Sequence, residues 1–332
     1  MKKIAVAAGG DSGEFSISIQ SGEVVYQHLD RTKYEPWFVV IDGLNWYVKA
    51  ADEAVYPIDR NDFSFLYQGE KICFDLVFIA IHGNPGENGR LQGYLDMLHI
   101  PYTSCNQLVS ALTFDKSLCK KLVAGSGARL APEVLITEGT AWNADTIISR
   151  LGLPLFVKPN NNGSSVGISK VKTRDELPEA IANALKADHE VLVEAFIPGR
   201  EITCGVMNDN GTTFAFPVTE IVPKKEYFDF EAKYDPLLSD EIVPAPIPAD
   251  IFSQCQEISC RLYDHLKCKG VVRFDYIFRD KLIFFLEVNT VPGLTNASIV
   301  PKMAKAHGWS IAHLFGRMVE NAFRDAATGS RI

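Results

Sequence analysis

The sequence predicts an α/β protein that starts with a doubly wound domain and continues as α+β. Three observations predict this fold class. Apolar strands alternate with helical stretches over residues 1–103, and the strand "DLVFIAIHG" is apolar on both faces, as a parallel-sheet strand should be. After residue 103 several strands come in pairs around short turns, which is typical of antiparallel sheets. The chain has 332 residues, a length that commonly folds into about two or three domains.

The first expected unit is an N-terminal α/β domain over residues 1–103. Its first strand is "IAVAAGG", which turns at glycine, and the apolar residues of "SISIQSGEVVYQHL" then follow with helical spacing. "EPWFVVID" is a second strand and "LQGYLDMLHI" a second helix, after which "PYTS" returns to the sheet. This alternation predicts a parallel sheet with helices on its faces.

The second expected unit is a small α+β domain over residues 104–195. "TFDKSLCKKLVAGSG" predicts a helix that starts near Thr113 or Asp115 and ends at Gly125 or Gly127. "LPLFVKP" and "VGISKV" predict strands on either side of a glycine-rich loop, "ELPEAIANALKA" predicts a helix, and "EVLVEAFI" predicts a further strand.

The third expected unit, residues 196–332, is an antiparallel-sheet domain. "REITCGVM" and "TFAFPVTEI" pair around the turn "NDNG", and "GVVRFDYIFRDKLIFFLEVN" forms a hairpin that turns near Asp280. Residues 249–268 and "SIAHLFGRMVENAFRDAA" predict helices. Residues 223–243 carry many charges and aromatic rings without periodicity, and long connections of this kind are often functional.

Composition excludes several classes of protein. The net charge is -8, which argues against a general nucleic-acid binder. The seven cysteines are odd in number and lack CxxC spacing, so we expect free thiols in a reducing cytoplasm. "MKKIAVAAGG" has too short an apolar run for a secretion signal, and we expect no membrane-spanning segment.

The final hairpin carries polar residues in an apolar setting. Side chains alternate along a strand, so Arg273 and Asp275 share a face, as do Glu287 and Asn289. A turn near Asp280 would place Asp275 roughly opposite Glu287 and Arg273 roughly opposite Asn289. Two carboxylates and an amide oxygen suit Mg²⁺ or Mn²⁺. A sheet face in which Arg273 neutralises one acid explains the residues equally well.

Three loops could bind the parts of a nucleotide or a substrate. "KPNNNGSSVG" offers N–H and hydroxyl donors beside Lys158, which could hold phosphate, although a plain hairpin turn explains it too. "EVLVEAFIPGREIT" could read an adenine edge, with Glu201 on ribose, or could carry ordinary exposed acids. "GGDSGEFSIS" begins a helix after the first strand, where Glu14 would suit an ammonium group or simply belong to a helix cap. A similar loop, "IAIHGNPGENG", is expected to expose His82 and Glu87, although a lone histidine is more often structural than catalytic.

The combination of motifs resembles a known family. "GGDSGE", "HGNPGENGRLQG", "KPNNNGSSVGISKV", "EAKY", "RFDYIF" and "LEVNTVPGLTNASIVP" occur in this order over nearly the whole chain. The sequence is similar to the D-alanine–D-alanine ligases of the ATP-grasp superfamily. The resemblance implies an ATP-grasp fold of three domains, an N-terminal domain (1–103), a central subdomain (104–195) and a C-terminal subdomain (196–332) with a lid loop at 223–243. ATP would lie between the last two.

The resemblance also implies a reaction and a site. ATP would phosphorylate the carboxylate of one D-alanine, and the amine of a second would attack the acyl phosphate to give D-alanyl-D-alanine, ADP and phosphate for peptidoglycan precursors. Two Mg²⁺ or Mn²⁺ ions would be held at the positions of Asp275, Glu287 and Asn289. The implied ATP-binding residues are Lys116, Lys158, Ser165, Glu194, Ala195, Phe196, Ile197, Glu201 and Lys233.

The implied substrate and catalytic residues surround the phosphates. Glu14 would bind the ammonium of the first D-alanine, and Arg273 and the N–H of Gly293 would stabilise the tetrahedral intermediate. The second substrate would meet the remaining residues of its site, Ser298, Ile299 and His82. Ser164, Lys233 and Tyr234 match residues of the closing loops, and Ser164 and Tyr234 are counted with the catalytic groups.

The sequence departs from the family pattern in several places and leaves alternatives open. "NPGENG" and "NTVPG" are mild variants, and "KPNNNGSSVG" lacks the charged residue common before its glycine. Phe15 and Ser16 stand where the family usually has charged residues before valine and serine. A D-alanine–D-lactate or D-alanine–D-serine ligase is the closest alternative, although the tyrosine of "EAKY" favours dipeptide formation. Another ATP-grasp carboxylate–amine ligase and a non-catalytic nucleotide-binding regulator are more distant ones. The family implies a homodimer formed through the N-terminal domain.

Overall fold

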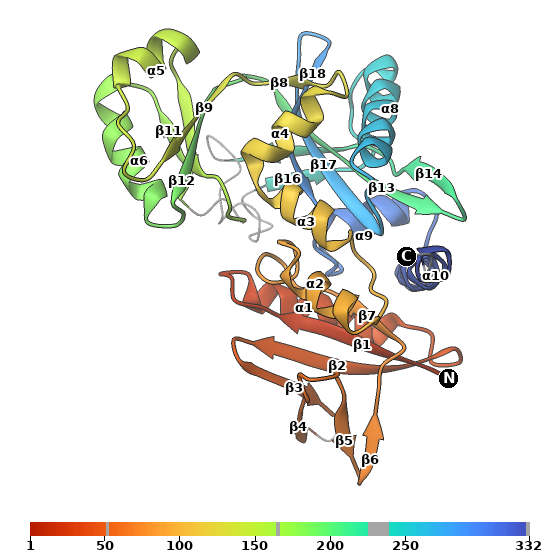
Figure 1. Cartoon of the computed structure of the whole chain (residues 1–332). Helices are drawn as coiled ribbons and strands as arrows, with labels where there is room; N and C mark the ends of the chain where they lie inside the picture. Colours follow the sequence, from red (N-terminus) through yellow and green to blue (C-terminus); the bar gives the residue numbers. More distant parts are fainter. Residues whose placement is uncertain (51–52, 164–166, 225–238, 330–332) are drawn as a thin grey trace.

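The computed structural model describes residues 1–50, 53–163, 167–224 and 239–329. Figure 1 shows three sheet-based parts: the N-terminal part lies at the bottom, a smaller part at upper left and a larger part at upper right. The helix α10, Ile311–Gly329, lies where the bottom part meets the larger upper part.

The N-terminal sheet has a parallel centre and an antiparallel edge. Its strands run in the order β4-β3-β2-β1-β7, with bounds β1 Lys2–Gly9, β2 Tyr34–Asp42, β3 Asn45–Lys49, β4 Val55–Pro57 and β7 Leu76–Ile79. Strand β1 pairs in parallel with β2 and β7, as the sequence predicts. The antiparallel extension through β3 and β4 was not predicted. "PYTS" does return to the sheet, through one parallel bridge between Val77 and Tyr102.

Both faces of this sheet are covered, which explains why its central strands are apolar throughout. Even-numbered residues of β1, such as Val6, face the helix α1, Phe15–His28, and α10. Odd-numbered residues, such as Ala5, face the helix α2, Arg90–Met97, and the hairpin of β5, Phe65–Tyr67, and β6, Glu70–Ile72. A strand buried on both faces needs no polar alternation.

The small sheet at upper left is antiparallel. Its order is β11-β10-β12-β9, with bounds β9 Glu133–Thr137, β10 Leu155–Pro159, β11 Ser169–Val171 and β12 Glu190–Ala195. The helices α5, Ala144–Leu151, and α6, Leu177–Leu185, cover one face, and the 3-10 helix η1, Arg174–Glu176, precedes α6. Val157 and Val193 pack under these helices, so the alternate residues Lys158 and Glu194 point to the opposite face.

The large sheet follows the order β16-β15-β13-β17-β18-β8. Its bounds are β8 Arg129–Leu130, β13 Arg200–Asp209, β14 Thr212–Ala215 (paired with β13), β15 Thr219–Pro223, β16 Ser239–Ile242, β17 Val271–Arg279 and β18 Leu282–Asn289. The helices of this part are α3 Gln107–Phe114, α4 Lys116–Ala124, α8 Ala249–His265 and α9 Ile299–Ala306. The sequence predicted α4 but not α3. Asp115 accepts from the N–H of Leu118 at 2.8 Å and begins α4, which makes two short helices of the stretch.

The β17–β18 hairpin has the register that the sequence predicts. Arg273 pairs with Asn289 and Asp275 pairs with Glu287. The turn is tight, with Asp280 and Lys281 both at positive φ, as in two-residue hairpin loops. A β-bulge after Asp275 leaves Leu286 without a partner and shifts the register by one residue. The bulge determines which side chains of β18 face the cleft.

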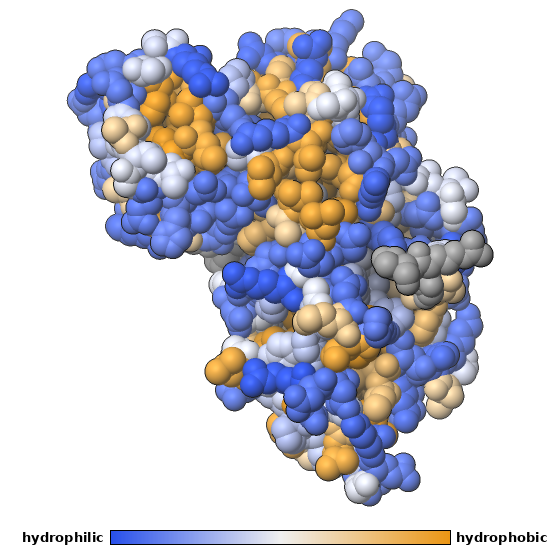
Figure 2. Space-filling model, in the orientation of Figure 1, coloured by the Kyte–Doolittle hydropathy of each residue, from blue (hydrophilic) through white to orange (hydrophobic). Residues whose placement is uncertain are grey.

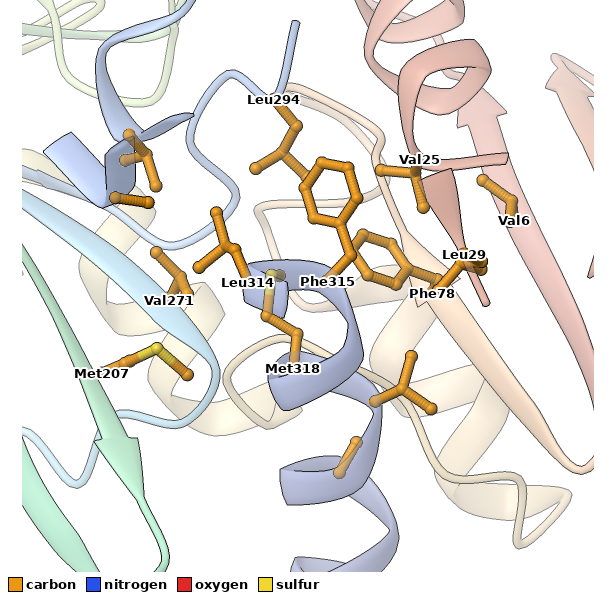
Figure 3. Close-up of a cluster of buried hydrophobic side chains, with 14 of the residues drawn as sticks. Val6, Val25, Leu29, Phe78, Met207, Val271, Leu294, Leu314, Phe315 and Met318 are labelled. Carbon is orange, nitrogen blue, oxygen red and sulfur yellow. The ribbon is translucent and has the colours of Figure 1, made fainter. Parts of the chain in front are cut away.

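The helix α10 joins the N-terminal and larger upper parts through a shared core (Figure 3). Phe315 meets Phe78 of β7 edge to face, with ring centroids 5.7 Å apart. Leu294, from the segment after β18, points into the same cluster. Among the helices that the structure describes, none is long and apolar enough to cross a bilayer.

Candidate active site

Two cavities adjoin at the centre of the molecule. The first, about 230 Å³, lies between the small and large sheets, and the second, about 480 Å³, lies between α1, the loop after β7 and the segment after β18. Arg273 and Gly163 border both. Figure 2 shows hydrophobic areas on either side of the boundary between the upper-left part and its neighbour. Groups bound in the two cavities would therefore meet at Arg273.

A buried charge cluster lies at one side of the first cavity. Glu194 is paired with both Lys158 and Lys120, and Lys120 also bonds Glu133 at 2.9 Å. Burial by itself would raise the pKa of Glu194, but Lys158 and Lys120 outweigh it and hold that pKa at about 2. The cluster keeps Glu194 ionised and places the Lys158 ammonium at the cavity wall.

The rest of the first cavity is a largely apolar slot. Phe156 and Phe196 lie at a ring-centroid distance of 5.7 Å, and Lys170 lies 4.0 Å above the Phe196 ring. Leu286, the bulged residue of β18, lines the slot with Ile277. The predicted nucleotide-contacting residues Ala195, Phe196, Ile197 and Glu201 all line it as well. A slot of this kind suits a flat heteroaromatic ring with polar edges.

Asn162 and Gly163, in the described part of the glycine-rich loop, line the first cavity together with Lys116. Lys116 Nζ donates to the carbonyl oxygen of Asn162 at 2.5 Å, and the Ser117 N–H donates to Asn160 Oδ1 at 2.9 Å. A Cβ at Gly163 would lie 3.0 Å from Glu14 Oε2, so the loop reaches the N-terminal part. Ser164 and Ser165 of this loop, and Lys233 and Tyr234 of residues 223–243, lie outside the described residues.

Arg273 and Asp275 form an ion pair at the junction of the cavities. Arg273 Nε and Nη2 donate to the two oxygens of Asp275 at 2.8 and 2.7 Å. Asn289 Nδ2 and Thr203 Oγ1 also donate to this carboxylate, at 3.0 and 2.5 Å. Burial opposes the charge on Arg273, but Asp275 outweighs this and raises the pKa of the guanidinium. The salt-bridged sheet face considered from sequence is therefore present.

The same face offers oxygen ligands for a divalent cation. Asp275 and Glu287 line the first cavity, and Asn289, whose amide nitrogen is used on Asp275, lines the second. These side chains fit Mg²⁺ or Mn²⁺ by donor type and by register. A cation there would share the Asp275 carboxylate with Arg273. The metal site and the salt-bridged sheet face, which the sequence left as alternatives, are therefore compatible.

The second cavity contains acids beside backbone donors. Glu14, Gly293, Ser298 and Ile299 line it, as do His82 and Glu87. Burial, and next the charge of Glu14, raise the pKa of Glu87 to about 7. Two nearby carboxylates in a buried setting favour a cationic ligand such as an ammonium group. Ser298 Oγ accepts from the Thr295 N–H at 3.1 Å at the start of α9.

One expectation from the sequence is wrong. The loop after β7 does not expose His82 and Glu87, which are 4% and 9% exposed. Both side chains point inward and bond the segment after β18: His82 Nδ1 lies 2.9 Å from the Val291 carbonyl oxygen, and the Val291 N–H donates to Glu87 at 3.3 Å. Packing of the N-terminal part on the segment after β18 buries them, which a local sequence pattern does not reveal.

Sequence reasoning also missed residues that the structure brings into the site. Lys120 and Glu133 complete the charge cluster, Thr203 bonds Asp275, and Ser21 bonds His82. For Lys120 a signal was available. It follows Lys116 by four residues, and this spacing places both on one face of α4. The other three come from elements distant in sequence.

Comparison with known proteins agrees with this geometry. The family model "D-ala D-ala ligase N-terminus" matches residues 3–105, and "D-ala D-ala ligase C-terminus" matches residues 122–320. D-alanine–D-alanine ligases of Flavobacterium johnsoniae and of Bacteroides fragilis strain YCH46 are 45% and 42% identical over 96% and 97% of this chain, each covered to 99%.

Solved structures give the same result. The D-alanine–D-alanine ligase from Coxiella burnetii superposes with a TM-score of 0.89 at 28% identity, covering 99% of this chain and 96% of that one. The VanG D-Ala:D-Ser ligase from Enterococcus faecalis superposes with a TM-score of 0.84 at 32% identity, covering 97% and 99%.

The fold and the paired cavities define an ATP-grasp ligase. Within that class, the chain belongs to the D-alanine–D-alanine ligase family. The family and fold expected from the sequence motifs are confirmed.

Proposed function

We propose that this chain joins two D-alanines to D-alanyl-D-alanine through a D-alanyl phosphate, with ATP converted to ADP and phosphate. The dipeptide would serve as a peptidoglycan precursor. One observation carries the proposal: an apolar slot with buried lysines and an acid-lined cavity meet at Arg273. A phosphate donor and a cationic carboxylic acid could react at that junction.

In the first step, the carboxylate of D-alanine would attack the γ-phosphorus of ATP. Its ammonium would lie near Glu14 and Glu87, which directs its carboxylate toward Arg273. The new bond joins a carboxylate oxygen to phosphorus, and the bond between phosphorus and the oxygen of ADP breaks. Lys116, Lys158 and Arg273 would offset the negative charge that accumulates there.

In the second step, the ammonium of another D-alanine would lose a proton to solvent, and the resulting amine would attack the acyl carbon. The bond from that carbon to the phosphate oxygen then breaks and phosphate leaves. Arg273 and the Gly293 N–H would stabilise the oxyanion, while Ser298 and Ile299 at the start of α9 would hold the second carboxylate. Acyl phosphates hydrolyse, so closing loops that exclude water would protect the intermediate, and we assign Ser164, Lys233 and Tyr234 to these loops.

We assign the metal site to Asp275, Glu287 and Asn289. Two Mg²⁺ or Mn²⁺ ions bound there would supply positive charge to the phosphate oxygens. We assign adenine recognition to Glu194, Ala195, Phe196 and Ile197 and the ribose contact to Glu201, which are placed around the apolar slot. One structural neighbour is a ligase of Bacillus anthracis complexed with ATP, with a TM-score of 0.79 and 28% identity.

A second candidate function is D-alanyl-D-serine formation. The observation that favours it is the structural similarity to a D-Ala:D-Ser ligase. The curated relatives at 42–45% identity are named D-alanine–D-alanine ligases, which favours D-alanine as the second substrate. The "EAKY" stretch that separates dipeptide from depsipeptide formation lies outside the described residues.

Organisation in solution is a further part of the proposal. We propose a cytoplasmic homodimer in contact through the N-terminal domain, where Met97 of α2 and Leu66 of β5 are exposed apolar side chains. The division at 1–103, 104–195 and 196–332 stays a prediction. Light scattering and limited proteolysis would measure mass and boundaries, and a monomer at micromolar concentration would contradict the dimer.

The central test is an assay of the purified chain with ATP, Mg²⁺ and D-alanine, in which phosphate release and dipeptide are both measured. We expect one phosphate per dipeptide and no turnover with L-alanine. Parallel assays with D-serine and D-lactate as second substrates test the alternative. Turnover without D-alanine dependence would overturn the proposal. Glu287→Gln should abolish turnover and leave the unfolding midpoint nearly unchanged, and retained activity would contradict the metal assignment.

A further inference from the structure

The segment that carries Gly293 is held by the N-terminal part of the chain. It follows β18 directly, yet its backbone groups at Val291 and Leu294 bond to side chains of α1 and of the loop after β7. The Leu294 side chain is also buried, in the core that α10 shares with both neighbouring parts (Figure 3). Gly293 therefore lies between two anchored residues.

The hydrogen bonds around His82 determine where its proton lies. Nδ1 faces the Val291 carbonyl oxygen at 2.9 Å, and a carbonyl oxygen only accepts, so Nδ1 carries a proton and donates. Nε2 lies 2.9 Å from Ser21 Oγ. Burial lowers the pKa of His82 and keeps the ring neutral, so Nε2 accepts from the Ser21 hydroxyl.

Ser21 completes the chain of hydrogen bonds. Its oxygen accepts from the Leu294 N–H at 3.3 Å while its proton goes to His82. The path thus runs from Leu294 through Ser21 and His82 back to the Val291 carbonyl, and it closes around Pro292–Gly293. Ser21 is fully buried and His82 nearly so, and buried polar networks in which each member is satisfied hold one arrangement.

We propose that Ser21 and His82 are positioning residues that fix the Gly293 N–H for the reacting carbonyl, and that His82 does not act as a base. The inference rests on the proposed function, because Gly293 matters only if an oxyanion forms beside it. Both imidazole nitrogens are used within the protein, which leaves no lone pair for a substrate amine. An oxyanion donor has to be held to a fraction of an ångström, so a shift of the segment lowers the rate without affecting ATP binding.

The structure supplies a matched control. Ser18 lies on the same helix as Ser21 and is equally buried, but it bonds the Gly9 N–H and the Ala80 carbonyl oxygen, both at 2.8 Å. Ser18→Ala removes the same atom from the same helix without touching the segment after β18. The test variants are Ser21→Ala and His82→Asn, since Asn can still donate to Val291 but cannot reach Ser21.

The experiment compares these variants with the wild type by three measurements. These are kcat for dipeptide synthesis, the affinity for ATP, and the affinity for a phosphinate that mimics the tetrahedral intermediate. For Ser21→Ala we expect kcat and phosphinate affinity to fall together, by roughly tenfold or more, with ATP affinity unchanged. In His82→Asn we expect smaller decreases in kcat and in phosphinate affinity, and in Ser18→Ala we expect no decrease in either. Amide hydrogen exchange at Val291 and Leu294 should quicken in Ser21→Ala and not in Ser18→Ala.

Two results would overturn the inference. One is a Ser21→Ala variant whose kcat and phosphinate affinity match those of Ser18→Ala. The other is a His82→Asn variant in which the alkaline or acidic limb of the kcat profile disappears, because that would show His82 titrating as the base. A wild-type protein that makes no dipeptide would contradict the proposed function itself, and the exchange measurement would then still report on the hydrogen-bond chain.

Discussion

The pKa of a buried carboxylate is shifted in opposite directions in the two cavities. In the first, Lys158 and Lys120 surround Glu194 and hold its pKa at about 2. In the second, Glu87 accepts from the backbone N–H groups of Gly83 and Val291, and burial, together with the charge of Glu14, raises its pKa to about 7. The first cavity already contains the cations that neutralise Glu194, while no lysine or arginine of the described residues forms an ion pair with Glu87.

This difference indicates what each cavity can bind. Both Lys158 and Lys120 pair with Glu194, so Glu194 would keep one cation if Lys158 turned to an anionic ligand such as phosphate. The acids of the second cavity are stabilised when a cation arrives, which suits the ammonium of an amino acid. The reaction that we propose needs both, and Arg273 lies where they meet.

Arg273→Met should have the largest effect, because it removes the side chain that borders both cavities. We expect kcat to fall by about 10³-fold or more and the free energy of unfolding to drop by about 3 kcal/mol, since Asp275 stays buried without its cation. Steady-state kinetics and urea unfolding measure the two. Arg279→Met on the same strand is the control, because Arg279 is exposed and pairs only with Asp280 in the described residues. Equal kcat values in Arg273→Met and Arg279→Met would contradict a role for Arg273 at the junction of the two cavities.

Lys120→Met tests the charge cluster of the first cavity. The change leaves Glu194 with Lys158 alone and leaves Glu133 without its bond to Lys120, so we expect a loss of about 3 kcal/mol in the free energy of unfolding. The KM for ATP should rise, because Lys158 is then held on Glu194. Lys121→Met, at the exposed neighbour, should change neither. An unchanged KM for ATP in Lys120→Met would show that Lys120 is only structural.

The pH dependence of stability should differ between the cavities. The folded-state pKa of Glu194 lies below its ordinary value of 4.5, so its contribution is present above pH 4.5 and is lost as pH falls toward 2. The size is about 3 kcal/mol. Urea unfolding from pH 6 to 2.5 should therefore be less pH-dependent in Glu194→Gln than in the wild type. If the free energy of unfolding changed with pH equally in Glu194→Gln and in the wild type, the pairing of Glu194 with Lys158 and Lys120 would be contradicted.

Glu87 should show the opposite sign. Its folded-state pKa of about 7 lies above the ordinary 4.5, so its contribution is present below pH 4.5 and is lost as pH rises through 7. An ammonium bound beside it would lower this pKa, so D-alanine binding near pH 7 should release part of a proton. Calorimetry in two buffers of different ionisation enthalpy measures that release, which Glu87→Gln should abolish. Equal proton release in the wild type and in Glu87→Gln would show that a group other than Glu87 titrates when D-alanine binds.

Arg174→Ala should have the smallest effect. Arg174 bonds Asp145 at 2.6 Å, but both side chains are exposed on the outer face of the small part. Solvent screens such pairs, so we expect no measurable change in Tm or kcat. A clear decrease in Tm would show that exposed ion pairs in this chain contribute to stability about as much as the buried pairs of the cavities.

Much of the fold and part of the site could be predicted from the sequence. The alternation of apolar residues predicted the strands, and the tight turn at Asp280 with strand alternation predicted that Asp275 faces Glu287. The prediction of exposed His82 and Glu87 was wrong, and α3 was missed, because neither a burying partner nor a break between two short helices has a strong local signal.

The sequence by itself determined the family, the order of strands and helices, and which strands carry polar side chains, because these depend on neighbours within a few residues. Only the tertiary structure decided which charges pair. Lys120 meets Glu194 from 74 positions away, and Ser21 meets Leu294 from 273 positions away. Such contacts depend on how the N-terminal, small and large sheets pack around the two cavities, and on how α10 joins the N-terminal sheet to the large one. The pKa values and the anchoring of Gly293 follow from that packing, since burial and the nearest charge determine both.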